Sequence, residues 1–468
     1  MSNPGDQDAT PIEPGPGLLA QLADHLAEGC KPRAQWRIGT EHEKFGFRTG
    51  DLTPPPYAPD GIEALLEAFA ADRSLPWEPI ADNGHLIGLK GLEAHEGASI
   101  SLEPAGQFEL SGAPLASLHQ TAAEMHGHFE ELHRAVDRSG TRLGFAPLGF
   151  HPTASRAQMP WMPKTRYAIM RRYMAEVGSL GLDMMQRTCT VQVNLDYGSE
   201  ADMRRKLQVA LALQPVATAL FANSPFREGV PSGFMSTRAH IWTDTDNARS
   251  GMPAPFFKPG FGFERFVDWV LDVPMYFVSR DGALRDVAGA SFRGWLAGRE
   301  PRLAGVAPTL GDFDDHLTTV FTDVRLKRFL EMRGSDAGSP AMMLAQSALW
   351  VGLLYDDAAL AAAHALVRRH DWTDYVSLRA LVPREGLSAR WGRGTVRDLA
   401  GEMVAIAADG LRARNLSGGG ASGADEGRFL EPLRAIVAGA PNQAEHWLAR
   451  YHGAWNGDAS RIFAEARI

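Results

Sequence analysis

Segments that alternate polar and apolar residues place the strongest constraint on what this chain can fold into. Such alternation runs over 36–47, 99–111, 183–197 and 326–333. A period of two predicts strands that present one polar and one apolar face. Within 99–111 the alternation continues on both sides of a Pro-Ala-Gly turn, which is typical of a β-hairpin. The sequence therefore predicts a sheet with one face against the core.

Helical segments are distributed unevenly around these strands. Apolar residues recur at helical spacing over 18–28, 62–71, 115–139 and 201–222, and helices dominate from about 341 to 468. Regular helices do not separate the strands, so a doubly wound parallel sheet is disfavoured. We expect an α+β fold in which helices pack outside an antiparallel sheet.

The ends and one internal stretch differ in composition from the rest. Residues 1–17 are rich in Pro, Gly, Asp and Gln, which predicts a disordered tail before a single domain over 18–468. Residues 417–427 (SGGGASGADEG) match GxGxxG literally. Because no strand precedes this match, we interpret the stretch as a flexible surface loop.

Composition narrows the possible functions. A net charge of −9 argues against a nucleic-acid partner. The apolar runs fall short of the roughly 20 residues that span a bilayer, so no membrane partner is expected. The motifs GxxxxGK[ST], GxSxG and HExxH are absent from the sequence. A P-loop, a serine hydrolase and a zincin therefore lose their main support.

Cysteine usage predicts a reducing compartment. The chain has two cysteines, Cys30 and Cys189, and no CxxC, which excludes a disulfide framework and a cysteine zinc site. Residues 1–17 resemble neither a secretion signal nor a plastid transit segment, so we expect a cytoplasmic location. Cys189 lies among valines and is interpreted as a buried small hydrophobe. The role of Cys30 stays open.

Carboxylates are the informative side chains of the predicted sheet. Glu41 and Glu43 lie two apart and leave the same face of one strand, while Glu103 and Glu109 flank the hairpin turn. Glu331 belongs to a further alternating segment. Glutamates on one face repel each other unless cations lie between them, and Mg²⁺ bridges carboxylates to substrate phosphates. Each strand alone could simply show solvent a polar face, but the combination favours a metal site.

Uncharged polar groups and arginines complete this pattern. In 183–197 one face carries Thr190, Gln192 and Asn194, which suits the lining of a cavity. Arg238 and Arg333 could each hold a carboxylate or phosphate through paired hydrogen bonds. The Gly, Asp and Asn content of 238–251 predicts a mobile, substrate-facing loop that closes the site.

At these segments the chain resembles the glutamate–cysteine ligases of the plant and proteobacterial type. The similar stretches follow the family's order over nearly the whole chain and include IGTEHEKFGF, SLEPAGQFELSGAP, RTCTVQVNLD, RAHIWTDTD and HLTTVFTDVRLKRFLEMRGSD. The resemblance implies a glutamine-synthetase-like fold, in which a curved antiparallel sheet forms a cradle for substrates. It implies ATP-dependent joining of the glutamate γ-carboxylate to the cysteine amine through γ-glutamyl phosphate, the first step of glutathione biosynthesis.

The resemblance also assigns roles to residues. It implies that two or three Mg²⁺ ions are held by Glu41, Glu43, Glu103, Glu109, Gln192 and Glu331. Arg238 is expected to bind the glutamate carboxylate and Arg333 to contact the transferred phosphate. Trp242 and Thr190 are expected to line the substrate pocket. The resemblance implies ATP as the co-substrate, and the protein is expected to be a monomer or homodimer. Plant members carry extra cysteines near the positions of Arg302 and Ala345, so their redox regulation should be absent here.

Three other functions stay open at this point. A ligase of the same fold could use an amine other than cysteine, because acceptor choice depends on few contacts. A protein that only senses ATP or glutamate is disfavoured by the complete set of acidic positions. A carboxylate-rich two-metal hydrolase would release phosphate without glutamate or cysteine. No residue is identified as the base for the cysteine amine.

Overall fold

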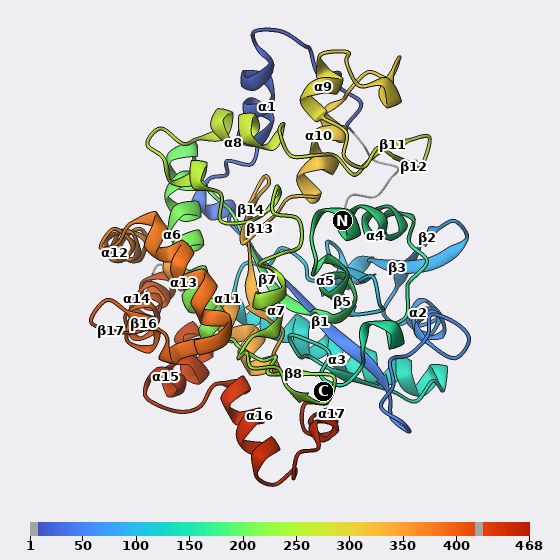
Figure 1. The fold of residues 1–468 in the computed structure, drawn as a ribbon, viewed down its shortest axis with the longest axis vertical. Helices are drawn as coiled ribbons and strands as arrows, with labels where there is room; N and C mark the ends of the chain where they lie inside the picture. The colour runs from blue at the N-terminus through green and yellow to red at the C-terminus, as the bar shows by residue number, and fades with distance from the viewer. Residues whose placement is uncertain (1–7, 417–424) are drawn as a thin grey trace.

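The centre of the molecule is a nine-stranded antiparallel sheet, seen in the computed structural model of residues 8–416 and 425–468 (Figure 1). Its order is β14-β15-β7-β1-β5-β4-β3-β2, and β6 also pairs with β1. The strands span Ile38–Arg48 (β1), Trp77–Asp82 (β2), His85–Gly91 (β3), Ser99–Leu102 (β4), Phe108–Ser111 (β5), Leu143–Ala146 (β6), Thr190–Leu195 (β7), Val324–Leu326 (β14) and Leu330–Asp336 (β15). The predicted α+β class and antiparallel sheet are confirmed.

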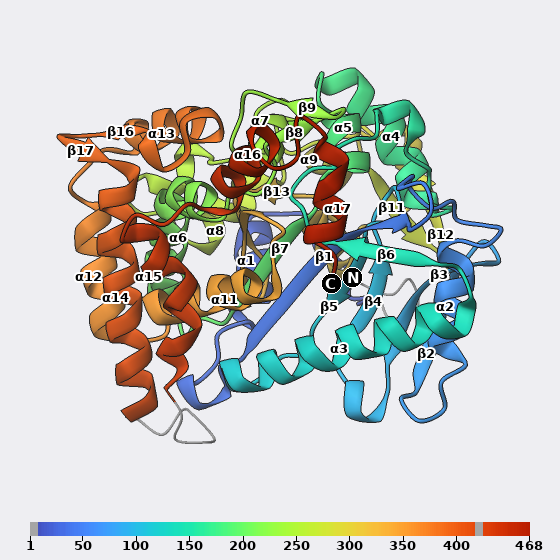
Figure 2. The same cartoon turned by 90° about the horizontal axis from the view of Figure 1, so that it is seen from below.

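Helices cover one face of the sheet and build the rest of the molecule. They are α1 (Leu18–Ala27), α2 (Ile62–Ala70), α3 (Leu118–Ser139), α4 (Thr165–Val177), α5 (Gly181–Arg187), α6 (Glu200–Leu220), α7 (Thr237–Ile241), α8 (Phe263–Val270), α9 (Phe292–Leu296), α10 (Leu310–Thr318), α11 (Pro340–Leu354), α12 (Asp357–Val367), α13 (Trp372–Glu385), α14 (Val396–Leu416), α15 (Glu431–Val437), α16 (Gln443–His452) and α17 (Ile462–Glu465). Figure 2 shows α3 crossing the back of the sheet. There His128 of α3 contacts Lys44 of β1, and Ser347 of α11 hydrogen-bonds Thr40.

Short two-stranded sheets lie outside the main one. They pair β8 (Phe226–Arg227) with β9 (Val230–Pro231), β10 (Ser250–Gly251) with β13 (Phe321–Thr322), β11 (Phe277–Arg280) with β12 (Ala283–Asp286), and β16 (Arg390–Trp391) with β17 (Gly394–Thr395). The β11–β12 hairpin approaches the polar face of the main sheet, because its residues Phe277 and Leu284 line the same cavity as Glu41 of β1.

One hydrophobic cluster joins the sheet to the C-terminal helices. It contains Val193 of β7, Met332 of β15, Leu211 of α6, Trp350 of α11 and Met403 of α14. In β7 the apolar residues therefore pack inward, as the alternation predicts, and the polar residues of the same strand are left for the opposite face. Cys189 is fully buried in a neighbouring apolar cluster, which confirms its interpretation.

Part of the predicted disordered tail is ordered by pairing. Ile12 N–H donates to the Pro308 carbonyl at 3.0 Å, and the amide of Leu310 donates to the Thr10 carbonyl at 2.9 Å. Ile12 is buried in the main cluster, so the prediction of disorder is wrong for 8–12 because an apolar anchor holds the segment. Residues 1–7 and 417–424 lie outside the described residues, including most of the glycine-rich stretch.

Among the described residues, no single helix is long and apolar enough to cross a membrane. Together α11 and α12 meet that criterion by length and composition, but they are bent by 92° at their junction.

Candidate active site

Glu41 and Glu43 lie at the centre of the polar face, on β1. In the pairing of β1 with β5, Glu43 is opposite Glu109, and in the pairing with β7, Glu41 is opposite Gln192. Glu43 accepts a hydrogen bond from the Thr190 amide at 2.9 Å. The residues between and after these glutamates point to the back of the sheet, as the alternation predicts. The two carboxylates of β1 therefore share one face.

The β4–β5 hairpin brings two further carboxylates to this face. Glu109 accepts a hydrogen bond from the Ser101 hydroxyl at 2.7 Å across the hairpin. Glu103 begins the turn, where its amide donates to the Gln107 carbonyl at 3.0 Å. The Tyr167 hydroxyl of α4 lies 3.4 Å from the Glu103 carboxylate. The predicted hairpin thus positions both glutamates beside β1.

Burial and mutual repulsion raise the pKa values of these carboxylates. Burial raises the pKa of Glu41 to about 7, helped by the charges of Glu331 and Glu109. Burial and the charges of Glu103 and Glu109 raise the pKa of Glu43 well above its ordinary value. Burial and the charge of Glu103 likewise raise the pKa of Glu109, which also hydrogen-bonds Glu41. The face therefore concentrates negative charge that cations would stabilise.

Glu331 lies on the same face but has cationic neighbours. Its carboxylate accepts hydrogen bonds from Nε and Nη2 of Arg325, the shortest at 2.7 Å. It also lies 3.1 Å from Lys327 Nζ. Arg333 also contacts it. Burial alone would raise the pKa of Glu331, but the charges of Arg325 and its two cationic neighbours hold it well below its ordinary value. Glu331 is therefore ionised in the folded chain.

Asn194 of β7 lies between Glu41 and Glu331 on the acidic face. It is opposite Glu331 in the pairing of β15 with β7, and its Nδ2 donates to Glu41 Oε1 at 2.7 Å. Two positions along β7, Gln192 accepts a hydrogen bond from Arg333. Thr190 donates its hydroxyl to the Ser335 carbonyl at 2.7 Å, which ties β7 to β15.

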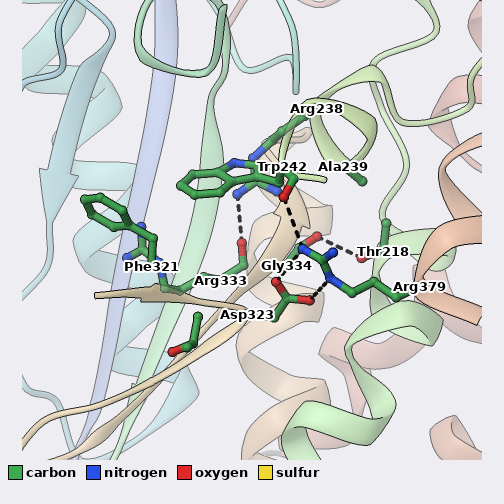
Figure 3. A pocket seen from close by; sticks show the side chains of 10 residues that line it. Thr218, Arg238, Ala239, Trp242, Phe321, Asp323, Arg333, Gly334 and Arg379 are labelled. Carbon is green, nitrogen blue, oxygen red and sulfur yellow. Dashed lines mark hydrogen bonds and ion pairs between the residues drawn. The ribbon is translucent and has the colours of Figure 1, made fainter. Parts of the chain in front are cut away.

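The arginines converge on a small pocket of about 30 Å³ (Figure 3). Arg238 Nη2 donates to the Arg333 carbonyl at 2.8 Å, so the two predicted arginines are neighbours. Trp242 lines the same pocket, and its buried indole N–H has no hydrogen-bond partner within the described part of the chain. Arg379 of α13 joins them through a two-pronged ion pair with Asp323, at 2.6 and 3.0 Å. A pocket with this surplus of N–H donors suits a carboxylate or phosphate.

Arg238 lies on a short helix and not on a loop, which corrects the prediction. The Ser236 hydroxyl accepts a hydrogen bond from the Ala239 amide at 3.0 Å and caps α7 at its N-terminus. Farther along, Arg249 is fully buried and pairs with Asp246 at 2.5 Å. The predicted loop over 238–251 is thus anchored at both ends, because polar side chains in it satisfy each other.

A larger cavity of about 930 Å³ opens along the polar face of the sheet. Glu41 and Asn194 form part of its floor. Its other walls come from the β2–β3 hairpin, the start of α4 and the β11–β12 hairpin, through Ile80, Lys90, Lys164, Arg166, Phe277 and Leu284. Walls that combine apolar and basic side chains beside an acidic floor, in this range of volume, are typical of small-molecule and cofactor sites.

The acidic residues have the donor chemistry of a magnesium site. Carboxylate oxygens are the ligands that Mg²⁺ prefers, and burial together with mutual repulsion raises the pKa values of these carboxylates. In the ranges 8–416 and 425–468 no three acidic, His or Cys side chains already converge on one ion position. The residues fit the ion by chemistry and by their common face, with side-chain adjustment on binding.

Comparison with known proteins identifies the chain. The model of glutamate-cysteine ligase family 2 matches residues 37–465. The chloroplastic glutamate–cysteine ligase of Medicago truncatula is 47% identical over 466 residues, covering 99% of this chain and 88% of that protein. The chloroplastic enzyme of Arabidopsis thaliana is 48% identical over 446 residues, covering 95% and 82%.

A solved structure agrees at the level of the fold. The Francisella tularensis glutamate–cysteine ligase in complex with AMP matches with a TM-score of 0.52 and 12% identity, covering 92% of this chain and 89% of that one. Together with the site, these comparisons define the class of the protein, which is an ATP-dependent ligase. The chain belongs to glutamate-cysteine ligase family 2, as its resemblance to that family predicts.

The same comparison contradicts the predicted cytoplasmic location. The relatives from Medicago truncatula and Arabidopsis thaliana are both chloroplastic. The prediction was wrong because a low cysteine count separates reducing from oxidising compartments and does not separate one reducing compartment from another.

Sequence reasoning missed several residues of the site. Arg325 and Lys327 lie at the two-residue spacing that leads to Glu331, so the sequence pattern could have placed them on the same polar face. Asn194 was assigned to the polar face without a role. Arg379 and Asp323 carried no signal, because α13 and the segment before β14 meet only in the folded chain.

Proposed function

We propose that this protein joins the γ-carboxylate of glutamate to the amine of cysteine with hydrolysis of ATP to ADP, giving γ-glutamylcysteine for glutathione biosynthesis. The observation that carries the proposal is the meeting of buried carboxylates from β1, β5 and β15 with two arginines on one face of the sheet. Family membership supports the same chemistry.

ATP is assigned to the cavity of about 930 Å³. Apolar side chains such as Ile80 and Phe277 can contact the base, while Lys164 and Arg166 line the cavity with positive charge for the phosphates. With Glu41 at the floor, the polyphosphate end of ATP would point toward the acidic face. This arrangement leaves the γ-phosphate between the acidic face and the arginine pocket.

Two or three Mg²⁺ ions are assigned to the acidic face. Glu41, Glu43, Glu103 and Glu109 would hold them, with Glu331 and Gln192 completing the set. When bound, Mg²⁺ neutralises phosphate charge and aligns the attacking and leaving oxygens. The carboxylates themselves would become fully ionised as the cations replace their protons.

Glutamate is assigned to the small pocket between Arg238, Trp242 and Arg333. The guanidinium of Arg238 would hold a substrate carboxylate, and the free indole N–H of Trp242 offers one more donor. Arg333, which lies between this pocket and Glu331, would contact the phosphate during transfer. A pocket of about 30 Å³ must widen to admit the substrate, so closure around glutamate is part of the proposal.

The reaction then proceeds in two steps. The glutamate γ-carboxylate oxygen attacks the γ-phosphorus of ATP, and ADP leaves. The cysteine amine attacks the resulting acyl carbon, loses a proton, and expels inorganic phosphate as the amide bond forms. Exclusion of water protects the acyl phosphate between the steps. The protein contributes position and charge, which is most of what phosphoryl transfer requires.

One assay tests the proposal and its rivals. ADP release is measured with Mg-ATP and glutamate, with and without cysteine, and the dipeptide is detected by mass. We expect rapid ADP release and γ-glutamylcysteine only when both amino acids are present. Faster turnover with another amine would identify that amine, and not cysteine, as the acceptor substrate. Phosphate release without amino acids would instead indicate a hydrolase and overturn the proposal.

A further inference from the structure

Lys327 holds an unusual position in the turn between β14 and β15. Its Nζ lies 3.1 Å from Glu331 Oε2 and 4.8 Å from the centre of the Phe329 ring. Its side chain is 24% exposed, whereas the Glu331 side chain is fully buried. An ammonium group is therefore held beside a carboxylate that is proposed to bind a metal ion.

The two halves of the acidic face differ in charge. In one half, Glu41 and Glu331 are accompanied by the cations of Arg325, Lys327 and Arg333. With both carboxylates ionised, three positive and two negative groups leave this half with a net charge of +1, and a proton on Glu41 makes it more positive. A divalent cation entering it meets positive charge.

In the other half, the hydrogen bonds to the carboxylates come from neutral donors, while Arg238 and Lys164 act on them electrostatically. Glu43 accepts from the Thr190 amide, Glu109 from the Ser101 hydroxyl, and Glu103 lies beside the Tyr167 hydroxyl. The three carboxylates act on each other electrostatically. A divalent cation here relieves repulsion directly.

Asn194 marks where a cation is missing between Glu41 and Glu331. Its Nδ2 donates to Glu41, which fixes the orientation of the amide. Its Oδ1 then lies buried beside Glu331 without a hydrogen-bond partner in the described ranges. A buried acceptor of this kind suits a ligand that arrives from outside the chain.

We propose that Lys327 is a built-in counter-ion that keeps the Glu41–Glu331 half closed to divalent cations until a nucleotide binds. The inference rests on the proposed function. The half with Glu43, Glu103 and Glu109 takes a divalent ion without nucleotide. The Glu41–Glu331 half takes one only when the polyphosphate brings negative charge that attracts Lys327 and Arg333 away from Glu331. Metal loading is therefore ordered.

Manganese binding to the full-length protein tests this order. Free Mn²⁺ is measured by electron paramagnetic resonance during titration, with and without a non-hydrolysable ATP analogue. Wild type should show one class of tight site without the analogue and a second class with it. In Lys327→Met the second class should appear without nucleotide, with affinity at least about tenfold above any second-class binding in wild type. Lys258→Met removes an exposed lysine and is the matched control, which should behave as wild type.

Several outcomes decide the matter. Identical nucleotide-free isotherms for wild type and Lys327→Met would overturn the inference. Lys327→Arg keeps the positive charge, so this variant should show the same two-step binding as wild type. One-step binding in Lys327→Arg would also contradict the inference. Arg325 and Arg333 still neutralise Glu331 in Lys327→Met, so we expect this variant to fold, as thermal melting would verify. If Lys327→Met does not fold, the smaller polar change Lys327→Gln is titrated instead. If wild type makes no dipeptide, the proposed function fails while the isotherms still decide the order of loading.

Discussion

Replacement of Glu41 by glutamine should stabilise the metal-free protein at alkaline pH while disabling the enzyme. Glutamine keeps the Oε1 atom that accepts from Asn194, and it removes a carboxylate that burial, Glu331 and Glu109 disfavour in its charged form. A buried carboxyl with a raised pKa costs the folded state more as pH rises, because the unfolded chain releases its proton first. The variant has no such cost.

The magnitude follows from the pKa of Glu41. Its pKa is about 7 in the folded chain against an ordinary 4.5. At about 1.4 kcal/mol per pH unit, that difference corresponds to at most about 3.5 kcal/mol, which develops between about pH 4.5 and 7 and stays constant above. For 468 residues the entropy of unfolding is about 1 kcal/mol/K, so the melting temperature of Glu41→Gln should rise by up to about 3.5 °C.

Thermal melts in a metal chelator at about pH 5 and about pH 8 provide the assay. Glu41→Gln should match wild type at the lower pH and exceed it at the higher one. Glu130→Gln changes an exposed carboxylate of α3 and should melt as wild type at both. Added Mg²⁺ should raise the wild-type melting temperature more than that of Glu41→Gln, because ligand binding stabilises the folded state by mass action. A variant less stable than wild type at the higher pH, or a difference independent of pH, would refute the reasoning.

Three further predictions concern the catalytic residues. Glu43→Gln should keep the fold, because its Oε atom can still accept from the Thr190 amide, but should lower ligation at least about 100-fold, measured as dipeptide formed. Arg238→Lys should raise the KM for glutamate about tenfold or more, since an ammonium cannot make paired hydrogen bonds, while an unchanged KM would remove Arg238 from the substrate pocket. Trp242→Phe should melt within about 1 °C of wild type, because its buried N–H has no partner to lose, yet raise the same KM by about tenfold. A loss of stability without a change in KM would make Trp242 a packing residue only.

The strands and the facing of their side chains could be predicted because alternation is a local property. Glu41 and Glu43 leave one face of β1 wherever that strand lies, and the β4–β5 hairpin places Ser101 opposite Glu109 across its own turn. The apolar face of β7 was readable for the same reason. Family resemblance then supplied roles that spacing alone does not.

Other features depended on which elements meet. The segment around Arg238 looks like a loop in sequence, but the Ser236 cap and the burial of Arg249 order it. The tail at 8–12 is polar in composition, and only its contact with 308–310 shows that Ile12 is anchored. Composition describes local preference and carries no information about such distant partners.

The sequence by itself determined the antiparallel strands, the polar face and the identity of its carboxylates, since a period of two fixes where each side chain points. Only the tertiary structure decided how those carboxylates are neutralised. Strand order placed Glu331 across β7 from Glu41 and gave it the cations of Arg325 and Lys327, while Glu43 and Glu109 received neutral donors. Electrostatic interaction falls with distance in space, not along the chain, so the charge balance of the site follows from the fold.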